Sequence, residues 1–195
     1  RGFFKFIAYL GYVFAKDTNK VIEANLNLVF ENSLSKDEIK EIQKYSYFNM
    51  LLWAQSLIEN LDVTDEELKN TVEIENAHII ENLRKEGKPL ILISAHYGNI
   101  EMLGCYINRF VTPLHQVARE SNFEEIDEFI VKSREASGSK IVFKSGALKK
   151  LVKALMQKEV VSLIIDQNIN SREGEEVLFL GKKAYQTSSS ASLAR

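Results

Sequence analysis

Two patterns of hydrophobic residues divide the chain near Gly87. Before this residue, three segments carry apolar side chains at helical spacing, and each predicts an amphipathic helix: residues 17–30, 35–60 and 64–87. The second and third segments open with the capping-box pattern, in which Ser or Thr precedes Glu by three residues. Gly87 suits the end of the third helix, because glycine adopts the left-handed conformation that closes many helices. The sequence therefore predicts a helical N-terminal region over residues 1–86.

After Gly87 the pattern changes to short apolar runs rich in β-branched residues. Four such runs predict strands: "PLILISA", "VTPLHQVAR", "KIVF" and "EVVSLIID". Helix-like segments lie between them, at residues 99–109, 122–136 and 146–158. Strands that alternate with helices form crossover units, and continuous apolar strands are typical of a sheet covered on both faces. We therefore expect an α/β fold with a mostly parallel sheet over residues 87–195, continuous with the helical region in one domain.

The N-terminal stretch of residues 1–14, "RGFFKFIAYLGYVF", is rich in aromatic residues but is too short and too charged to span a bilayer by itself. It suits the end of a spanning helix, an interfacial helix, or an ordinary helix that packs on the domain. The start at Arg1 and the ending "SSSASLAR" lead us to expect a chain truncated at both ends.

Composition narrows the classes of function. A net charge of −2 gives no reason to expect nucleic-acid binding. One cysteine and three histidines provide no thiolate cluster and argue against a multi-histidine metal site, so we expect no metal and no cofactor. Charge is uneven, however: residues 131–160 hold eight basic and two acidic side chains. This stretch is either a solvated face or a surface for an acidic partner, such as anionic lipid or an acidic carrier protein.

The strongest candidate for chemistry is "SAHYGNIE". His96 follows a predicted strand, Gly98 allows a tight turn, and Glu101 falls in the first turn of the next helix. In open α/β sheets, ligands bind where strands end and helices begin. A carboxylate that holds one imidazole nitrogen leaves the other as a base, and such a pair suits removal of a proton from an alcohol. Alternatively, Glu101 is a carboxylate that interacts favourably with the dipole at the N-terminus of the helix, and His96 is a capping residue.

Two further strands end in polar residues at the same expected edge. Arg119 ends the second strand, with Asn122 shortly after, and its guanidinium suits a phosphate group. A salt bridge with a neighbouring glutamate is the alternative. Asp166 and Gln167 follow the fourth strand, where they position substrate, brace Arg119 or anchor a loop.

The order of these motifs resembles a known family. "SAHYGNIE" is similar to the His–four residues–Glu/Asp motif of the glycerolipid and lysophospholipid acyltransferase superfamily. "NLNLVF", "VARESN", "LVKALMQKEVVSLIIDQN" and "VLFLGKKAYQTSSSASLAR" resemble further segments of its lipid A biosynthesis branch, the late lauroyl and myristoyl transferases. Two positions depart from the pattern: Glu31 stands where proline is usual, and Leu180 where a second phenylalanine is common.

The resemblance implies transfer of a fatty acyl chain from an acyl carrier protein thioester to a hydroxyl of a Kdo-linked lipid A precursor. It implies a membrane-associated enzyme of the bacterial inner membrane whose active site faces the cytoplasm. His96 and Glu101 would be catalytic. Substrate binding would involve the polar residues near the strand ends: Gly98, Asn99, Arg119, Asn122, Asp166 and Gln167. Another membrane lipid or glycolipid acceptor, or a non-catalytic membrane-surface module, are the alternatives.

Overall fold

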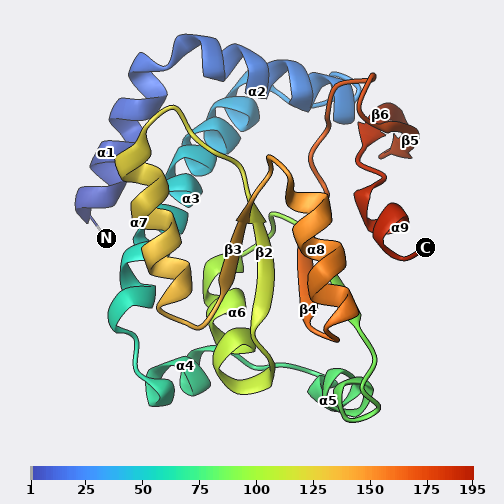
Figure 1. Cartoon of the computed structure of the whole chain (residues 1–195). Helices are drawn as coiled ribbons and strands as arrows, with labels where there is room; N and C mark the ends of the chain where they lie inside the picture. The colour runs from blue at the N-terminus through green and yellow to red at the C-terminus, as the bar shows by residue number, and fades with distance from the viewer. Residues whose placement is uncertain (1) are drawn as a thin grey trace. The chain divides into compact units, whose positions relative to one another are not determined.

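The computed structural model describes residues 2–195, and these form two compact units (Figure 1). One unit contains the chain up to Gln55 together with Leu178–Lys182. The other contains Ser56–Val177 and Lys183–Arg195. The division falls inside helix α3 rather than at residue 86. The two regions of the sequence analysis are therefore regions of secondary structure, and the proposed domain boundary stays a prediction.

The helical region is confirmed by five helices: α1 (Gly2–Phe14), α2 (Lys16–Val29), α3 (Lys36–Asp62), α4 (Asp65–Thr71) and α5 (Ala77–Lys85). Strands and helices then alternate: β1 (Leu90–Ser94), α6 (Ile100–Tyr106), the π-helical turn η1 (Ile107–Val111), β2 (Leu114–Ala118), α7 (Glu124–Glu135), β3 (Lys140–Phe143), α8 (Ala147–Met156) and β4 (Val160–Ile164). A hairpin and a short helix follow: β5 (Glu175–Phe179), β6 (Lys182–Gln186) and α9 (Ser189–Leu193).

The first unit is held together by polar contacts around Tyr47 of α3. Its hydroxyl lies 3.0 Å from Asn19 Oδ1, and the Asn19 amide donates to the Tyr12 carbonyl at 2.7 Å. Gly11 of α1 lies against the Tyr47 ring: a Cβ there would come within 3.1 Å of it. Glycine therefore lets α1 approach this ring closely.

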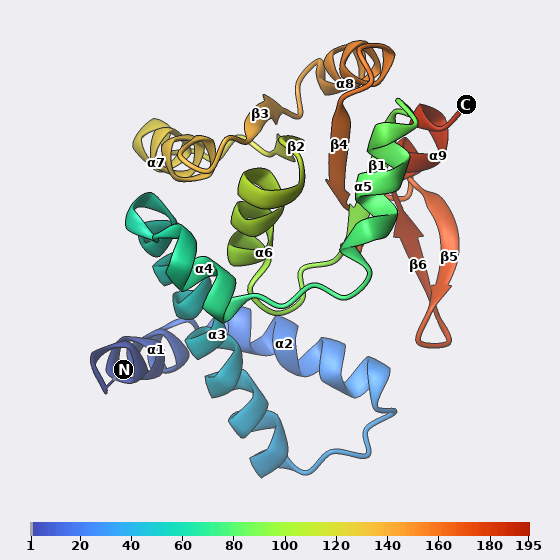
Figure 2. The ribbon, with the colours of Figure 1, turned by 90° about the horizontal axis from the view of Figure 1, so that it is seen from below.

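The second unit is built on a four-stranded parallel sheet with the order β1-β4-β2-β3. The predicted α/β class with a parallel sheet is therefore confirmed. Helix α8 lies on one face of the sheet and α6 on the other, while α7 runs beside edge strand β3 (Figures 1 and 2). The core between α8 and the sheet consists of buried aliphatic residues: Val142, Ala147, Leu151, Ala154, Val161 and Leu163. Their burial holds the strand ends in fixed register.

The capping boxes at Ser35 and Thr64 are confirmed. The Glu38 carboxylate accepts from the Ser35 backbone at 2.8 Å, and Glu67 does the same for Thr64 at 2.9 Å. The single helix predicted over residues 64–87 is wrong, however. The chain leaves the helix at Val72, which is extended, and α5 starts only after Asn76, whose φ is +60°. Sequence spacing alone did not show this break.

No helix among residues 2–195 has both the length and the apolar composition needed to cross a bilayer.

Candidate active site

The carboxyl edge of the sheet gathers the polar residues that the sequence singled out. Strand β4 lies between β1 and β2, and its register with β1 pairs Ser94 with Ile164. His96 and Asp166 each follow their strand by two residues, so the register places them opposite each other. Arg119 directly follows β2, the other neighbour of β4. Parallel pairing therefore brings segments about 20 to 70 residues apart in sequence to one edge.

Asp166 holds His96 through two contacts. Its Oδ1 lies 2.8 Å from His96 Nδ1, and its Oδ2 accepts the His96 backbone N–H at 2.9 Å. The side chains of His96 and Asp166 are 43% and 31% exposed, so the pair is open to solvent and to a substrate. With Nδ1–H donating to the carboxylate, the imidazole keeps its lone pair on Nε2. The geometry thus prepares a base whose ring orientation is fixed.

The carboxyl group of Asp166 is adapted to this role. Partial burial raises its pKa, but the hydrogen bonds from the side chain and backbone of His96 outweigh burial and lower the pKa below its ordinary value. Asp166 is therefore ionised at neutral pH. An ionised carboxylate beside Nδ1 stabilises the positive charge that the imidazole gains when Nε2 takes a proton.

Glu101 makes a contact that its spacing did not suggest. Both of its carboxylate oxygens accept hydrogen bonds from Arg134 of α7, at 3.0 Å from Nε and 2.7 Å from Nη2. The Glu101 side chain is only 4% exposed and that of Arg134 16%. Glu101 lies in the first turn of α6, as predicted, but its side chain points to α7. The structure brings His96 together with Asp166, and Glu101 together with Arg134.

The turn between β1 and α6 follows the sequence prediction. Gly98 has a φ of +65°, a left-handed conformation that favours glycine, and nothing lies within 4 Å of the position where a Cβ would be. Asn99 caps α6: its side chain accepts from the Met102 N–H at 3.0 Å. This cap fixes the direction in which α6 leaves the edge, and so helps to set the place of His96.

Arg119, Asn122 and Gln167 are exposed in the loops that follow β2 and β4. Within residues 2–195, no ion pair joins Arg119 to a carboxylate, and the salt bridge considered from the sequence is not formed there. The loop that carries Asn122 is ordered by the neighbouring Ser121 N–H, which donates to both Asp127 oxygens at 3.0 and 2.9 Å. The loop after β2 therefore offers an exposed guanidinium at the carboxyl end of a strand that neighbours β4.

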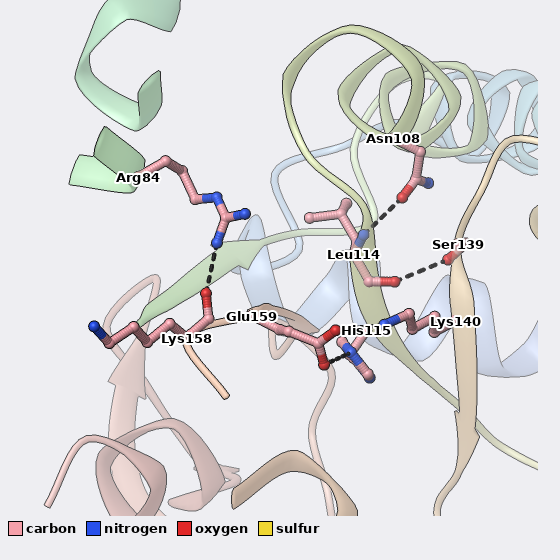
Figure 3. A network of polar contacts seen from close by, with 8 residues as sticks. All are labelled: Arg84, Asn108, Leu114, His115, Ser139, Lys140, Lys158 and Glu159. Atoms are coloured by element: carbon pink, nitrogen blue, oxygen red, sulfur yellow. Dashed lines mark hydrogen bonds and ion pairs between the residues drawn. The ribbon is translucent and has the colours of Figure 1, made fainter. Parts of the chain in front are cut away.

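A separate network of polar contacts connects the amino ends of the strands, at the side of the sheet opposite to His96 (Figure 3). His115 Nε2 lies 2.7 Å from Glu159 Oε2, and Lys140 contacts the other oxygen of the same carboxylate. Hydrogen bonding to Lys140 is the main cause of a lowered pKa at Glu159. These contacts tie together the starts of β2, β3 and β4. His115 therefore has a structural role, and it lies near the start of β2, whereas Arg119 follows the end of that strand.

A family model described as bacterial lipid A biosynthesis acyltransferase matches residues 1–195, the entire chain. The chain belongs to this family. It is an acyltransferase, and the resemblance read from its motifs is confirmed. The comparison with curated proteins found no match.

Two features of this lipid A biosynthesis acyltransferase were not found from its sequence. Arg134 gave no signal, because nothing in the linear spacing connects it with Glu101 across 33 residues. The pairing of His96 with Asp166 did leave a signal: each residue stands two positions after its strand. Reading that signal required the strand order, which the alternation of strands and helices does not supply.

Proposed function

We propose that this acyltransferase moves a fatty acyl chain from an acyl carrier protein thioester to a hydroxyl of a Kdo-linked lipid A precursor. The observation that carries the proposal is the contact of 2.8 Å between His96 Nδ1 and Asp166 Oδ1. It supplies an exposed imidazole with its basic nitrogen directed away from the carboxylate. Membership of the family supports the general reaction.

In the proposed reaction, Nε2 of His96 removes the proton of the acceptor hydroxyl. The hydroxyl oxygen forms a bond to the thioester carbonyl carbon, the carbon–sulfur bond breaks, and the thiolate leaves with the proton that His96 carried. The acyl chain passes directly between substrates, so the enzyme forms no covalent intermediate. Gly98 and Asn99, in the turn that follows His96, are the proposed donors of backbone N–H groups to the oxyanion of the intermediate.

The carboxylate that orients His96 in this mechanism is Asp166. The sequence had suggested Glu101, and both residues remain in the proposed site with different tasks. Asp166 contacts the imidazole directly. Glu101 anchors the first turn of α6 to α7 through Arg134, and so it supports the turn on which His96 stands. The contact of Asp166 with the imidazole and the contact of Glu101 with Arg134 support this division of tasks.

Arg119 is the proposed binder of the acceptor. Its guanidinium is exposed at the edge that carries His96, and guanidinium groups bind phosphates through paired hydrogen bonds. Lipid A precursors carry phosphates. Asn122 and Gln167, in the adjoining loops, would add hydrogen bonds to the sugar or the phosphate.

We further propose that the protein works at the cytoplasmic face of the inner membrane and contacts it through α1. The side chains of Phe3, Phe6, Tyr9 and Phe14 are between 52% and 76% exposed. Aromatic residues on one helix face favour the boundary between head groups and acyl chains. Lipid vesicles should therefore bind the protein, and replacement of Phe3 and Phe6 by serine should weaken that binding.

The experiment is acyl transfer by the full-length protein, read by mass spectrometry of the acceptor. Incubation with acyl carrier protein thioester and a Kdo-bearing precursor should add one acyl mass. His96→Ala should abolish this product while the thermal unfolding curve stays that of a folded protein. Transfer only to a glycerophospholipid or another glycolipid would contradict the proposed acceptor and retain the chemistry. Near-normal turnover by His96→Ala would refute the mechanism.

A further inference from the structure

The solvent-exposed side of helix α8 carries an apolar stripe and, next to it, a basic stripe. Its buried face consists of Ala147, Leu151 and Ala154, which pack on the sheet. The outward face has an apolar stripe at four-residue spacing: Leu148, Val152 and Met156 are 56%, 40% and 80% exposed. A basic stripe of Lys149, Lys150 and Lys153 lies beside it, also exposed. Residues three or four apart lie on one face of a helix, so the apolar stripe runs along most of α8 and the lysines cover about one turn beside it.

The lysines of this surface are available to a partner. Helix α8 contains no acidic residue, and among the described residues no ion pair engages Lys149, Lys150 or Lys153. The nearest carboxylate in sequence, Glu159, is already in contact with His115 and Lys140. Helix α8 therefore offers three unneutralised positive charges next to exposed apolar side chains.

The surface also has a hollow at its side. A depression of about 330 Å³ lies toward the C-terminal end of α8, near the starts of β2, β3 and β4, and its polar lining residues are His115, Lys140, Lys150, Lys153, Gln157 and Glu159. Lys140 lines it from β3, where Glu159 balances its charge. Unpaired lysines on one side of a hollow suit an acidic side chain of a binding partner.

We infer that the outward face of α8 is the docking surface for the acidic acyl carrier protein, an inference that rests on the proposed function. Strand β3 ends at Phe143, so the first turn of α8 starts at the carboxyl edge of the sheet, where His96 and Asp166 lie. A carrier seated there is next to the site that must receive its thioester.

The composition of α8 favours a protein partner over a lipid surface. Helices that lie in membrane interfaces carry Trp, Phe and Leu on their apolar face, and the aromatic residues sit at the level of the head groups. The apolar stripe of α8 has Leu, Val and Met and no aromatic residue. Methionine is enriched in protein interfaces because its flexible side chain adapts to a partner. Positive charge beside such a stripe complements an acidic helix of a carrier protein.

The test compares two charge-reversal variants of the full chain, each of which changes the net charge equally. Lys149→Glu/Lys153→Glu alters the proposed surface, and Lys85→Glu/Lys132→Glu alters exposed lysines of α5 and α7. Binding of fluorescently labelled acyl carrier protein is measured by anisotropy at low and moderate salt. We expect at least tenfold weaker binding and a smaller salt dependence for the α8 variant, and less than a twofold change for the control.

A second readout separates docking from chemistry. For the α8 variant, kcat/KM with the carrier-protein thioester should fall by a similar factor, whereas transfer from a small acyl-pantetheine thioester should stay unchanged. If charge reversal impairs folding, judged by circular dichroism, Lys149→Gln/Lys153→Gln should show a smaller loss in the same direction. Val152→Ser should also weaken carrier binding, because it interrupts the apolar stripe.

The outcomes are distinct. Equal carrier binding by the α8 variant and the wild type would overturn the inference while the proposed acyl transfer stands. Loss of binding to anionic phospholipid vesicles, with carrier binding intact, would overturn it in favour of a lipid surface. If the wild type transfers no acyl group from any donor, the proposed function fails, and the anisotropy comparison still decides whether α8 binds the carrier.

Discussion

Replacement of Glu101 by alanine should destabilise the protein strongly, because the change leaves the partly buried Arg134 guanidinium without its carboxylate. The two hydrogen bonds measure 3.0 and 2.7 Å, and the side chains are 4% and 16% exposed. An exposed ion pair contributes about 0–1 kcal/mol. A buried pair is different: removal of one partner typically costs about 3–5 kcal/mol. For a chain of this size, that loss corresponds to a fall in Tm of roughly 6–20 °C.

The assay is urea unfolding of the wild type, Glu101→Ala, Arg134→Met and the double variant. Because Arg134→Met removes the charge but keeps an apolar side chain, the double variant should recover part of the stability that Glu101→Ala loses. A loss below about 0.5 kcal/mol, which is the scale of surface substitutions, would refute the anchoring role. So would a double variant whose loss is the plain sum of the single losses. A stable Glu101→Ala protein without activity would instead support the direct dyad.

Three further predictions concern the turn and the two edges of the sheet. The pKa of Asp166 is lowered by folding, so its stabilising contribution is fully present above its unfolded pKa of about 4 and is lost as the pH falls through the lower folded value. Thermal melts should therefore show that the difference in Tm between the wild type and Asp166→Asn shrinks in that acidic range. A difference in Tm that is constant with pH would contradict this prediction. Gly98→Ala should cost about 1–2 kcal/mol in chemical unfolding, since its φ is +65° and no clash adds to the strain; an unchanged midpoint would show that the turn relaxes. Glu159→Gln should cost about 1 kcal/mol through weakened contacts with His115 and Lys140, with turnover retained; a loss of turnover without a loss of stability would argue for a function at that edge.

Much of the fold could be predicted from the sequence because local patterns determine it. Continuous apolar runs bounded by turn residues identified the four strands of the parallel sheet to within a few residues. The capping boxes at Ser35 and Thr64 involve neighbours three residues apart, and so they too could be read locally. The hairpin of β5 and β6 was missed: its turn at Leu180 and Gly181, both with positive φ, has little of the sequence signature of a common two-residue turn.

The candidate site shows the limit of such reasoning. His96, Gly98 and Asn99 were identified because strand, turn and helix follow one another along the chain. The partner of His96 depends on which strand lies beside β1, and that strand is β4, 70 residues further on. Glu101 was assigned to His96 by proximity in sequence, and that pairing stays a prediction. The contact of its side chain with Arg134 on α7 could not be read from the spacing. Spacing predicts the position of a residue better than it predicts the contacts of its side chain.

The most direct test of the central claim is acyl transfer under single turnover by three full-length variants, His96→Ala, Asp166→Asn and Glu101→Gln, each with its stability measured alongside. General-base catalysis by His96 predicts a loss of about 10²–10⁴-fold for His96→Ala, and a large loss for Asp166→Asn with the protein still folded. It predicts that the residual loss for Glu101→Gln tracks its loss of stability. Wild-type rates for Asp166→Asn, with His96→Ala inactive and Glu101→Gln inactive but stable, would contradict the account and return the orienting role to Glu101.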